Sequence, residues 1–382
     1  WNNLNLLDGT YTGKVFQVGF KGAETIDVTI DDAATTAIGK FTMVSESHAD
    51  KMTTGQISAL KAATLTLAGY LGSAAVTLAV DATDTNTSVK KVSADINAVK
   101  DATGIEATAI TKGKISNVSG IGKISFDLAG NQTNGVAATF YDVTATLASV
   151  NDLDPLADAI NAFAANTGIT ARLGATAAEI ILTHQTGETI ELKSLSINNA
   201  NTDATMYLTA LDKFGNANTT ADTTLSRAAN TATSVITLGA GATTTSKARG
   251  HVLGQMTLNS IKSFTVTGDD TTAEEGFFDK LHSYTGQTSG GGTAQLSAVS
   301  SISVADQEHA SDAIAVLDAA IAKIDQQRAD LGAITNRLSA VVDNNTSMVT
   351  NTESSKSHIL DKDFAVETTK LTRTQILQQA AT

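Results

Sequence analysis

Histidine is the residue type in this chain with the widest chemical range, because it can act as a base or as a metal ligand. The histidines lie far apart, and no two of them are spaced four residues apart on a predicted helix. They are His48, His184, His251, His282, His309 and His358. Glu308-His309 has the wrong order for a zinc-protease motif. We therefore expect each histidine to be solvated or to cap a helix.

Other patterns that would support catalysis or phosphate binding are incomplete. Gly-Lys pairs occur at residues 13–14, 39–40, 113–114 and 122–123, but Ser or Thr never follows, so none is a phosphate-binding loop. No Ser lies in a Gly-x-Ser-x-Gly motif. The chain has 0 Cys, which excludes disulfides, thiolate zinc sites and a cysteine nucleophile.

Acidic residues provide two weak candidates for cation binding. Asp84 begins a stretch with calcium-loop spacing, but Val89 stands where an EF-hand requires Gly, so we do not expect one. Asp152 and Asp154 precede a predicted helix, whose N-terminus favours negative charge, and a weak surface cation there remains the alternative. We expect no enzyme activity, no cofactor and no metal.

Charge and hydropathy exclude two further classes of partner. Lys plus Arg is 26 and Asp plus Glu is 39, which gives a net charge of −13. An acidic chain lacks the electrostatic surface for nucleic acid or anionic lipid. Residues 62–80 are uncharged but rich in Thr, Ala and Gly. We expect a short helix, a turn at Gly72 and a strand from Ala74 there, and no membrane insertion.

Composition and periodicity divide the chain into five segments. They are a β-hairpin within residues 1–45, a β-rich domain at 46–200, a second β-rich region at 201–300, a long helix at 301–352, and the start of a terminal helical segment at 353–382. The fold class is therefore α+β, multidomain and elongated, with a long C-terminal α-helical rod.

The segment at 46–200 contains an internal repeat, with modules at about 74–137 and 138–200. Ile96-Asn97-Ala98 recurs 64 residues later as Ile160-Asn161-Ala162. Thr103-Gly104-Ile105 recurs as Thr167-Gly168-Ile169 in the same register. Both glycines are placed where a helix ends in a left-handed residue, so we expect two small β-α-β modules.

The C-terminal segment shows strong helical periodicity. Ser303 and Asp306 form a predicted capping box. Two sets of apolar residues at 3-4 spacing follow, offset by a register slip near Arg328. A helix of some forty residues is about 60 Å long, and its apolar stripe needs a partner helix. A second helix is expected from about Asp361 to Ala380. The candidate packing residues are Ile314, Leu317, Ile321, Ile324, Arg328, Leu331, Ile334, Asn336, Arg337, Leu338 and Val341.

These residues resemble bacterial flagellin, the flagellar filament subunit. The resemblance covers Arg328-Ala329-Asp330-Leu331-Gly332-Ala333, Asn336-Arg337-Leu338 and Asp361-Lys362-Asp363-Phe364-Ala365. Leu6-Leu7-Asp8-Gly9-Thr10 matches the segment that follows the family's N-terminal helix, and the repeats resemble modules inserted in the outer part of many flagellins. Against the family's pattern, the chain is expected to be truncated at both termini.

The resemblance implies a structural subunit that self-assembles for motility and is extracellular. Residues 1–45 and 301–352 would belong to the core domain, and residues 46–300 to solvent-exposed outer domains. Implied partners are other flagellin subunits, the flagellar export apparatus and a chaperone, with a surface glycan as a further option. The alternative is a cell-surface adhesin or polysaccharide-binding protein of flagellin type, although few aromatic residues are present to stack on sugars.

Overall fold

The computed structural model describes residues 5–19, 22–45, 47–52, 63–78, 88–130, 139–198, 205–217, 235–239, 249–268, 291–360 and 363–381. The chain divides into two compact units. Unit 1 comprises Trp1–Ala34 and Ile321–Thr382, and unit 2 comprises Thr35–Ala320. The helix predicted over Glu274–Ser283 lies outside the described residues.

Unit 2 is built on antiparallel sheets, as the alternating Thr and aliphatic residues favour. Its eight-stranded sheet follows the order β10 (Ile169–Leu173), β11 (Ile180–His184), β7 (Glu106–Ser116), β16 (Gln255–Ser260), β3 (Gly39–Val44) and β19 (Gln295–Ala298). β13 (Thr205–Leu211) also pairs with β7, and β14 (Val235–Gly239) pairs with β13.

Two smaller sheets complete the described part of unit 2. One has the order β4 (His48–Met52), β15 (Arg249–Leu253), β12 (Ile190–Ile197), β8 (Gly122–Ala129) and β9 (Tyr141–Leu147). The other has the order β18 (Gly291–Thr293), β17 (Thr265–Gly268), β5 (Ala63–Ala68) and β6 (Ser73–Leu78). The helix expected before Gly72 is therefore wrong, because Ala63–Ala68 pairs as a strand with Ser73–Leu78.

Each repeat module contributes one helix that packs between two sheets. In module 1, α1 (Val89–Asn97) and the one-turn α2 (Lys100–Thr103) precede β7; in module 2, α3 (Asp154–Asn161) and α4 (Ala164–Thr167) precede β10. The strands before and after each helix belong to different sheets, and both modules share the eight-stranded sheet.

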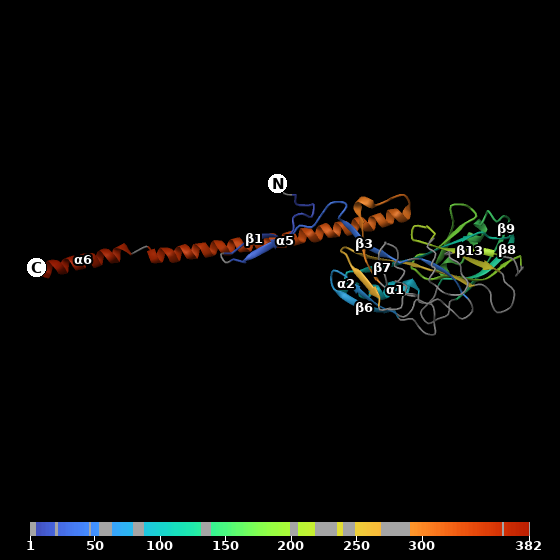
Figure 1. The fold of residues 1–382 in the computed structure, drawn as a ribbon, viewed down its shortest axis with the longest axis horizontal. Helices are drawn as coiled ribbons and strands as arrows, with labels where there is room; N and C mark the ends of the chain where they lie inside the picture. Colours follow the sequence, from blue (N-terminus) through green and yellow to red (C-terminus); the bar gives the residue numbers. More distant parts are fainter. Residues whose placement is uncertain are drawn as a thin grey trace. The chain divides into compact units, whose positions relative to one another are not determined.

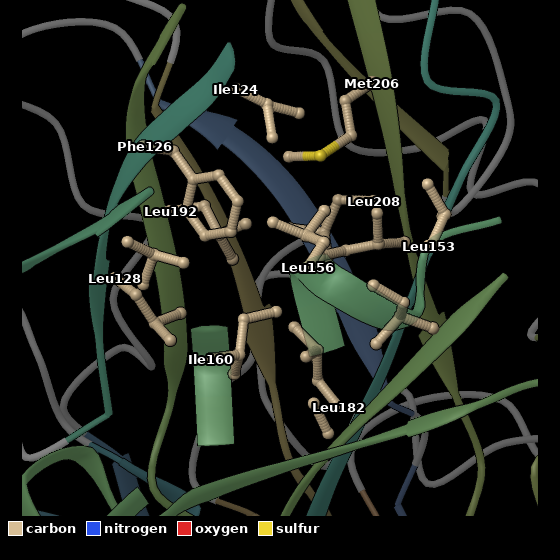
Figure 2. Packing of buried hydrophobic residues seen from close by; sticks show 14 of the residues in the cluster. Ile124, Phe126, Leu128, Leu153, Leu156, Ile160, Leu182, Leu192, Met206 and Leu208 are labelled. Atoms are coloured by element: carbon tan, nitrogen blue, oxygen red, sulfur yellow. The ribbon is translucent and has the colours of Figure 1, made fainter. Parts of the chain in front are cut away.

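The apolar face of each helix closes one of two cores. Val92 and Ile96 of α1 lie fully buried among residues of β5, β7, β16 and β17. Leu156 and Ile160 of α3 are equally buried in the larger core. Figure 2 shows the α3 side chains among those of β8, β11, β12 and β13, including Phe126, Leu128, Leu182, Leu192 and Leu208.

The first and last strands of unit 2, β3 and β19, are neighbours in the eight-stranded sheet. β3 pairs with β19, so that Gly39 lies opposite Ala298 and Thr42 opposite Gln295. The short 3₁₀ helix η1 (Val299–Ser301) follows, and Ser300 N donates to Thr35 O at 3.0 Å. The two ends of the chain segment that forms unit 2 are therefore hydrogen-bonded to each other.

Unit 1 contains two helices and a two-stranded sheet. β1 (Lys14–Gln17) pairs with β2 (Thr25–Val28). α5 (Gln307–Leu360) begins in unit 2 and continues without a break through 54 residues, and α6 (Phe364–Ala381) follows. Figure 1 draws both helices in orange to red. None of the helices in the described residues is long and apolar enough to cross a membrane.

Asp306, rather than Ser303, caps the start of α5. Asp306 Oδ1 accepts from His309 N at 2.7 Å, which is the geometry of an N-cap residue bonded to the third helical amide. Ser303 Oγ reaches only Ala305 N, at 3.4 Å. The predicted start signal was therefore placed one turn too early.

Candidate assembly surface and its attachment

From residue 327 onward, the half-buried positions of α5 form one stripe. They are Gln327, Leu331, Ile334, Leu338, Val341 and Asn345, so that five steps cover 18 residues at 3.6 residues per step. This is the repeat of a straight α-helix. Gln327 Nε2 donates to Asp31 O at 2.9 Å, and Asn345 Nδ2 donates to Val18 O at 2.8 Å.

Hydrogen bonds connect the hairpin segment to the two ends of this stripe. Ile26, Val28 and Ile30 are buried and lie in sequence between Val18 and Asp31, the two residues bonded to α5. The hairpin segment is therefore bonded to α5 at both ends of the stripe. Four of the candidate residues, Leu331, Ile334, Leu338 and Val341, lie between these two bonds and are half-buried.

The first set of candidate residues lies on another face of the same helix. Ile314 is 61% exposed, Leu317 is 40% exposed and Ile321 is 59% exposed. Their neighbours Ala313, Val316 and Ala320 are buried instead. Ala320 is in line with Gln327, since seven residues make nearly two turns. The helix runs unbroken past Arg328, so the offset between the two sets places them on different sides of one continuous helix.

The remaining candidates and α6 are mostly open to solvent. Arg328, Asn336 and Arg337 are exposed, and Ile324 is half-buried. No residue of α6 is buried. The large exposed aliphatic and aromatic side chains of the two helices also include Val342, Met348, Val349, Ile359, Leu360, Phe364, Val366, Leu371, Ile376 and Leu377.

Five charged side chains fix the first turns of α5 to the sheets of unit 2, and we call them the lysine cluster. Lys40 Nζ and Lys213 Nζ both donate to Asp312 Oδ1, at 2.9 and 2.8 Å. Lys112 Nζ donates to Glu308 Oε1 at 2.7 Å and to Lys213 O at 2.7 Å. The Lys40 and Lys112 side chains are only 6% and 3% exposed.

Burial and ion pairing oppose each other in the lysine cluster. Burial would raise the pKa of Asp312, but hydrogen bonds from Lys213 and Lys40 hold that pKa below its ordinary value. The bond from Lys112 lowers the pKa of Glu308. Burial lowers the pKa of Lys213, and Asp312 counteracts this shift. Each buried ammonium therefore relies on a carboxylate of α5.

An aromatic stack supports the same attachment. The ring of His309 stacks on Phe214 with centroids 4.3 Å apart, and His309 Nδ1 lies 2.7 Å from Asp306 Oδ2. His309 thus contributes packing and capping. Sequence reasoning did not find the lysine cluster. The one available signal was Lys112 within the apolar strand pattern, because lysine is rarely fully buried unless it is paired.

Within the described residues, no group of three or more His, Asp or Glu side chains is arranged to hold a metal ion. A long helix that exposes large aliphatic side chains, and whose acidic residues pair with buried lysines of a sheet, is typical of a structural subunit that associates with other polypeptides.

Comparisons with known proteins agree with this class. Residues 314–382 match the bacterial flagellin C-terminal helical region, and residues 124–185 match the flagellin hook IN motif. The B-type flagellin of Pseudomonas aeruginosa is 30% identical over 377 residues, covering 99% of this chain and 68% of that protein. Flagellin A of Vibrio cholerae is 47% identical over 92 residues, 24% of each chain.

The chain belongs to the bacterial flagellin family, the structural subunits of the flagellar filament. The match spans about two thirds of the B-type flagellin, 68% of its length, and 24% of Flagellin A. The adhesin alternative is not favoured, because these relatives are flagellins.

Proposed function

We propose that this chain builds an extracellular flagellar filament through the exposed apolar side chains of α5 and α6, which pack against helices of other flagellin subunits. The observation that carries the proposal is the row of large side chains left in solvent on both helices, beginning with Ile314, Leu317 and Ile321. The candidate packing residues remain proposals in this role.

Energetics favour a partner for these helices. Burying one large aliphatic side chain contributes about 1.5–3 kcal/mol, so a row of them supplies a substantial driving force for association. Most helical stability in proteins comes from packing of an apolar face. α6 has no buried residue in this chain, and packing on other subunits would supply what it lacks.

Export and outer-surface roles complete the proposal. The absence of cysteine means that no disulfide has to be opened for the chain to pass the flagellar export apparatus unfolded, with a chaperone as its partner before export.

We propose that the β-rich part, residues 46–300, faces solvent in the filament, where Thr-rich strands would be accessible to a glycan.

A pair of matched charge substitutions tests the assembly surface. In a filament-forming flagellin that contains this chain, Ile321→Asp should abolish filaments seen by negative-stain electron microscopy, because it places a charge in the apolar contact. Ala322→Asp adds the same charge at the next exposed position and should leave assembly intact. Normal filaments from Ile321→Asp would refute the proposed contact surface.

A further inference from the structure

The first turns of α5 bury the smaller of two available apolar faces. Ala313 and Val316 are 4% and 1% exposed, whereas Ile314 is 61% exposed and Leu317 is 40% exposed. Successive residues of an α-helix are about 100° apart, so turning the helix by one residue would exchange these faces.

Apolar burial alone favours the opposite choice. Ile and Leu side chains each gain more free energy on burial than Ala, because they remove more apolar area from water. A helix attached only by hydrophobic contacts would therefore turn Ile314 and Leu317 toward the eight-stranded sheet. Another interaction must select the observed rotation.

The lysine cluster lies on the buried face and can make that selection. Glu308, Asp312, Val316 and Ala320 are spaced by four residues and share one side of the helix. Three ammonium groups, from β3, from β7 and from the turn that follows β13, converge on the two acids. A rotated helix would carry Glu308 and Asp312 away and leave buried lysines unpaired, which costs far more than burying Ile instead of Ala gains.

We propose that the lysine cluster, rather than the apolar contacts, sets the rotation of the first turns of α5. Glu308 and Asp312 are positioning residues: they hold the large side chains of this helix in solvent. The consequence for filaments rests on the proposed function, since the face kept in solvent is the one proposed to meet other subunits.

Cysteine labelling measures the rotation directly, because the chain has no cysteine of its own. Ala313→Cys and Ile314→Cys are introduced one at a time, and the rate of labelling by a water-soluble maleimide is measured on the chain in dilute solution. Labelling at 314 should be much faster than at 313. Adding Asp312→Asn should reduce the ratio of the two rates by at least about tenfold, since buried lysines lose their partner.

Four companion variants separate positioning from general stability. Asp318→Asn changes an exposed acid of the same helix and should leave the ratio unchanged. Lys112→Glu with Glu308→Lys exchanges one pair and should restore the ratio that Lys112→Glu alone reduces. His309→Ala removes the stack on Phe214 and should reduce the ratio less than Asp312→Asn does.

The combined Lys40→Met, Lys112→Met and Lys213→Met variant, with Glu308→Gln and Asp312→Asn, removes every ion pair of the cluster and addresses the case in which single changes unfold the sheet. Buried ion pairs replaced by apolar residues often keep or gain stability. The variant should fold, as judged by circular dichroism, while the labelling difference between 313 and 314 is lost. A preserved difference would overturn the proposal. The labelling experiment does not require filaments to form. If the filament assay refutes the proposed function, the test of the rotation of α5 is therefore unaffected.

Discussion

The two repeat modules have the same internal hydrogen bonds but different surroundings. Asn97 exchanges two bonds of 2.8 Å with the backbone of Ala107, and Asn161 does the same with Ala171. In both modules a threonine hydroxyl, of Thr103 or of Thr167, then links the helix end to the next strand.

The modules differ in the side chain that lies against the left-handed glycine. A Cβ on Gly104 would lie 2.2 Å from Cε1 of Tyr70, which is 40% exposed, whereas a Cβ on Gly168 would lie 2.4 Å from Nε2 of His184, which is 6% exposed. The pattern of backbone bonds is therefore kept in both copies, while the covering residue is not. The repeated part of the module is the turn from helix to strand.

Substituting the two glycines gives the largest expected contrast. Gly104 and Gly168 have φ of 73° and 72°, so alanine costs about 1–2 kcal/mol at either position. Tyr70 can move into solvent, but His184 cannot, so Gly168→Ala should cost about 3 kcal/mol in total and Gly104→Ala less. Native-state hydrogen exchange of the β7 and β10 amides measures the loss of stability in each module. Equal losses would contradict the claim that Tyr70 can move away from its glycine while His184 cannot.

Removing the asparagines should affect both modules alike. Asn97→Ala and Asn161→Ala each leave the N–H and C=O of an alanine without their partner, at a cost of about 1–3 kcal/mol. Amide exchange of Ala107 and Ala171 reports each loss separately. A large loss in one module and none in the other would show that the repeated hydrogen bonds do not have a common role.

Acid should weaken module 2 through His184. Burial lowers the pKa of His184 below 6.5; Glu188 and the Thr167 backbone oppose this shift, and Lys90 adds to it. The folded state thus favours neutral histidine, so its contribution is present above pH 6.5 and is lost as the pH falls, by at most about 1.4 kcal/mol per pH unit. Unfolding at pH 7 and pH 5 should show a difference that His184→Gln removes; an unchanged pH dependence in that variant would contradict the assignment.

The helix starts provide the smallest contrast. Ser88 caps α1 by accepting from Lys91 N, whereas α3 has no side-chain cap and begins with Pro near its first turn. Ser88→Ala should cost roughly 0.5–1 kcal/mol. Asp152→Ala, which removes an exposed bond to Asp154 N, should cost only a few tenths, at most about 0.5 kcal/mol. Hydrogen exchange of the α1 and α3 amides measures the two losses of stability. A larger loss in α3 than in α1 would contradict the expected order.

Local patterns allowed prediction of the helical elements. The periodicity of α5 and the termination of two helices at Gly104 and Gly168 depend on residues close in sequence, and the structure has both features. The five-part domain division stays a prediction. The strand at Ala63–Ala68 was misassigned because an uncharged Ala- and Thr-rich run suits a helix or a strand, and its pairing partners decided the outcome.

The rotation of α5 was not predictable in the same way. Lys40 and Asp312 are 272 residues apart in sequence, and Lys112 and Glu308 are 196 apart. Nothing within the helix reveals that such distant lysines meet its acids. Hydrophobic periodicity alone selected Ile314 and Leu317 as packing residues, and in this chain they are the ones left in water.

Because Thr42 of β3 lies opposite Gln295 of β19, the roughly 250 residues between them are topologically equivalent to one enlarged loop. A tight connection could join these two strands and preserve their ladder. Evolution could therefore lengthen, shorten or exchange the segment between β3 and β19 as one unit, without changing the path of the chain outside it.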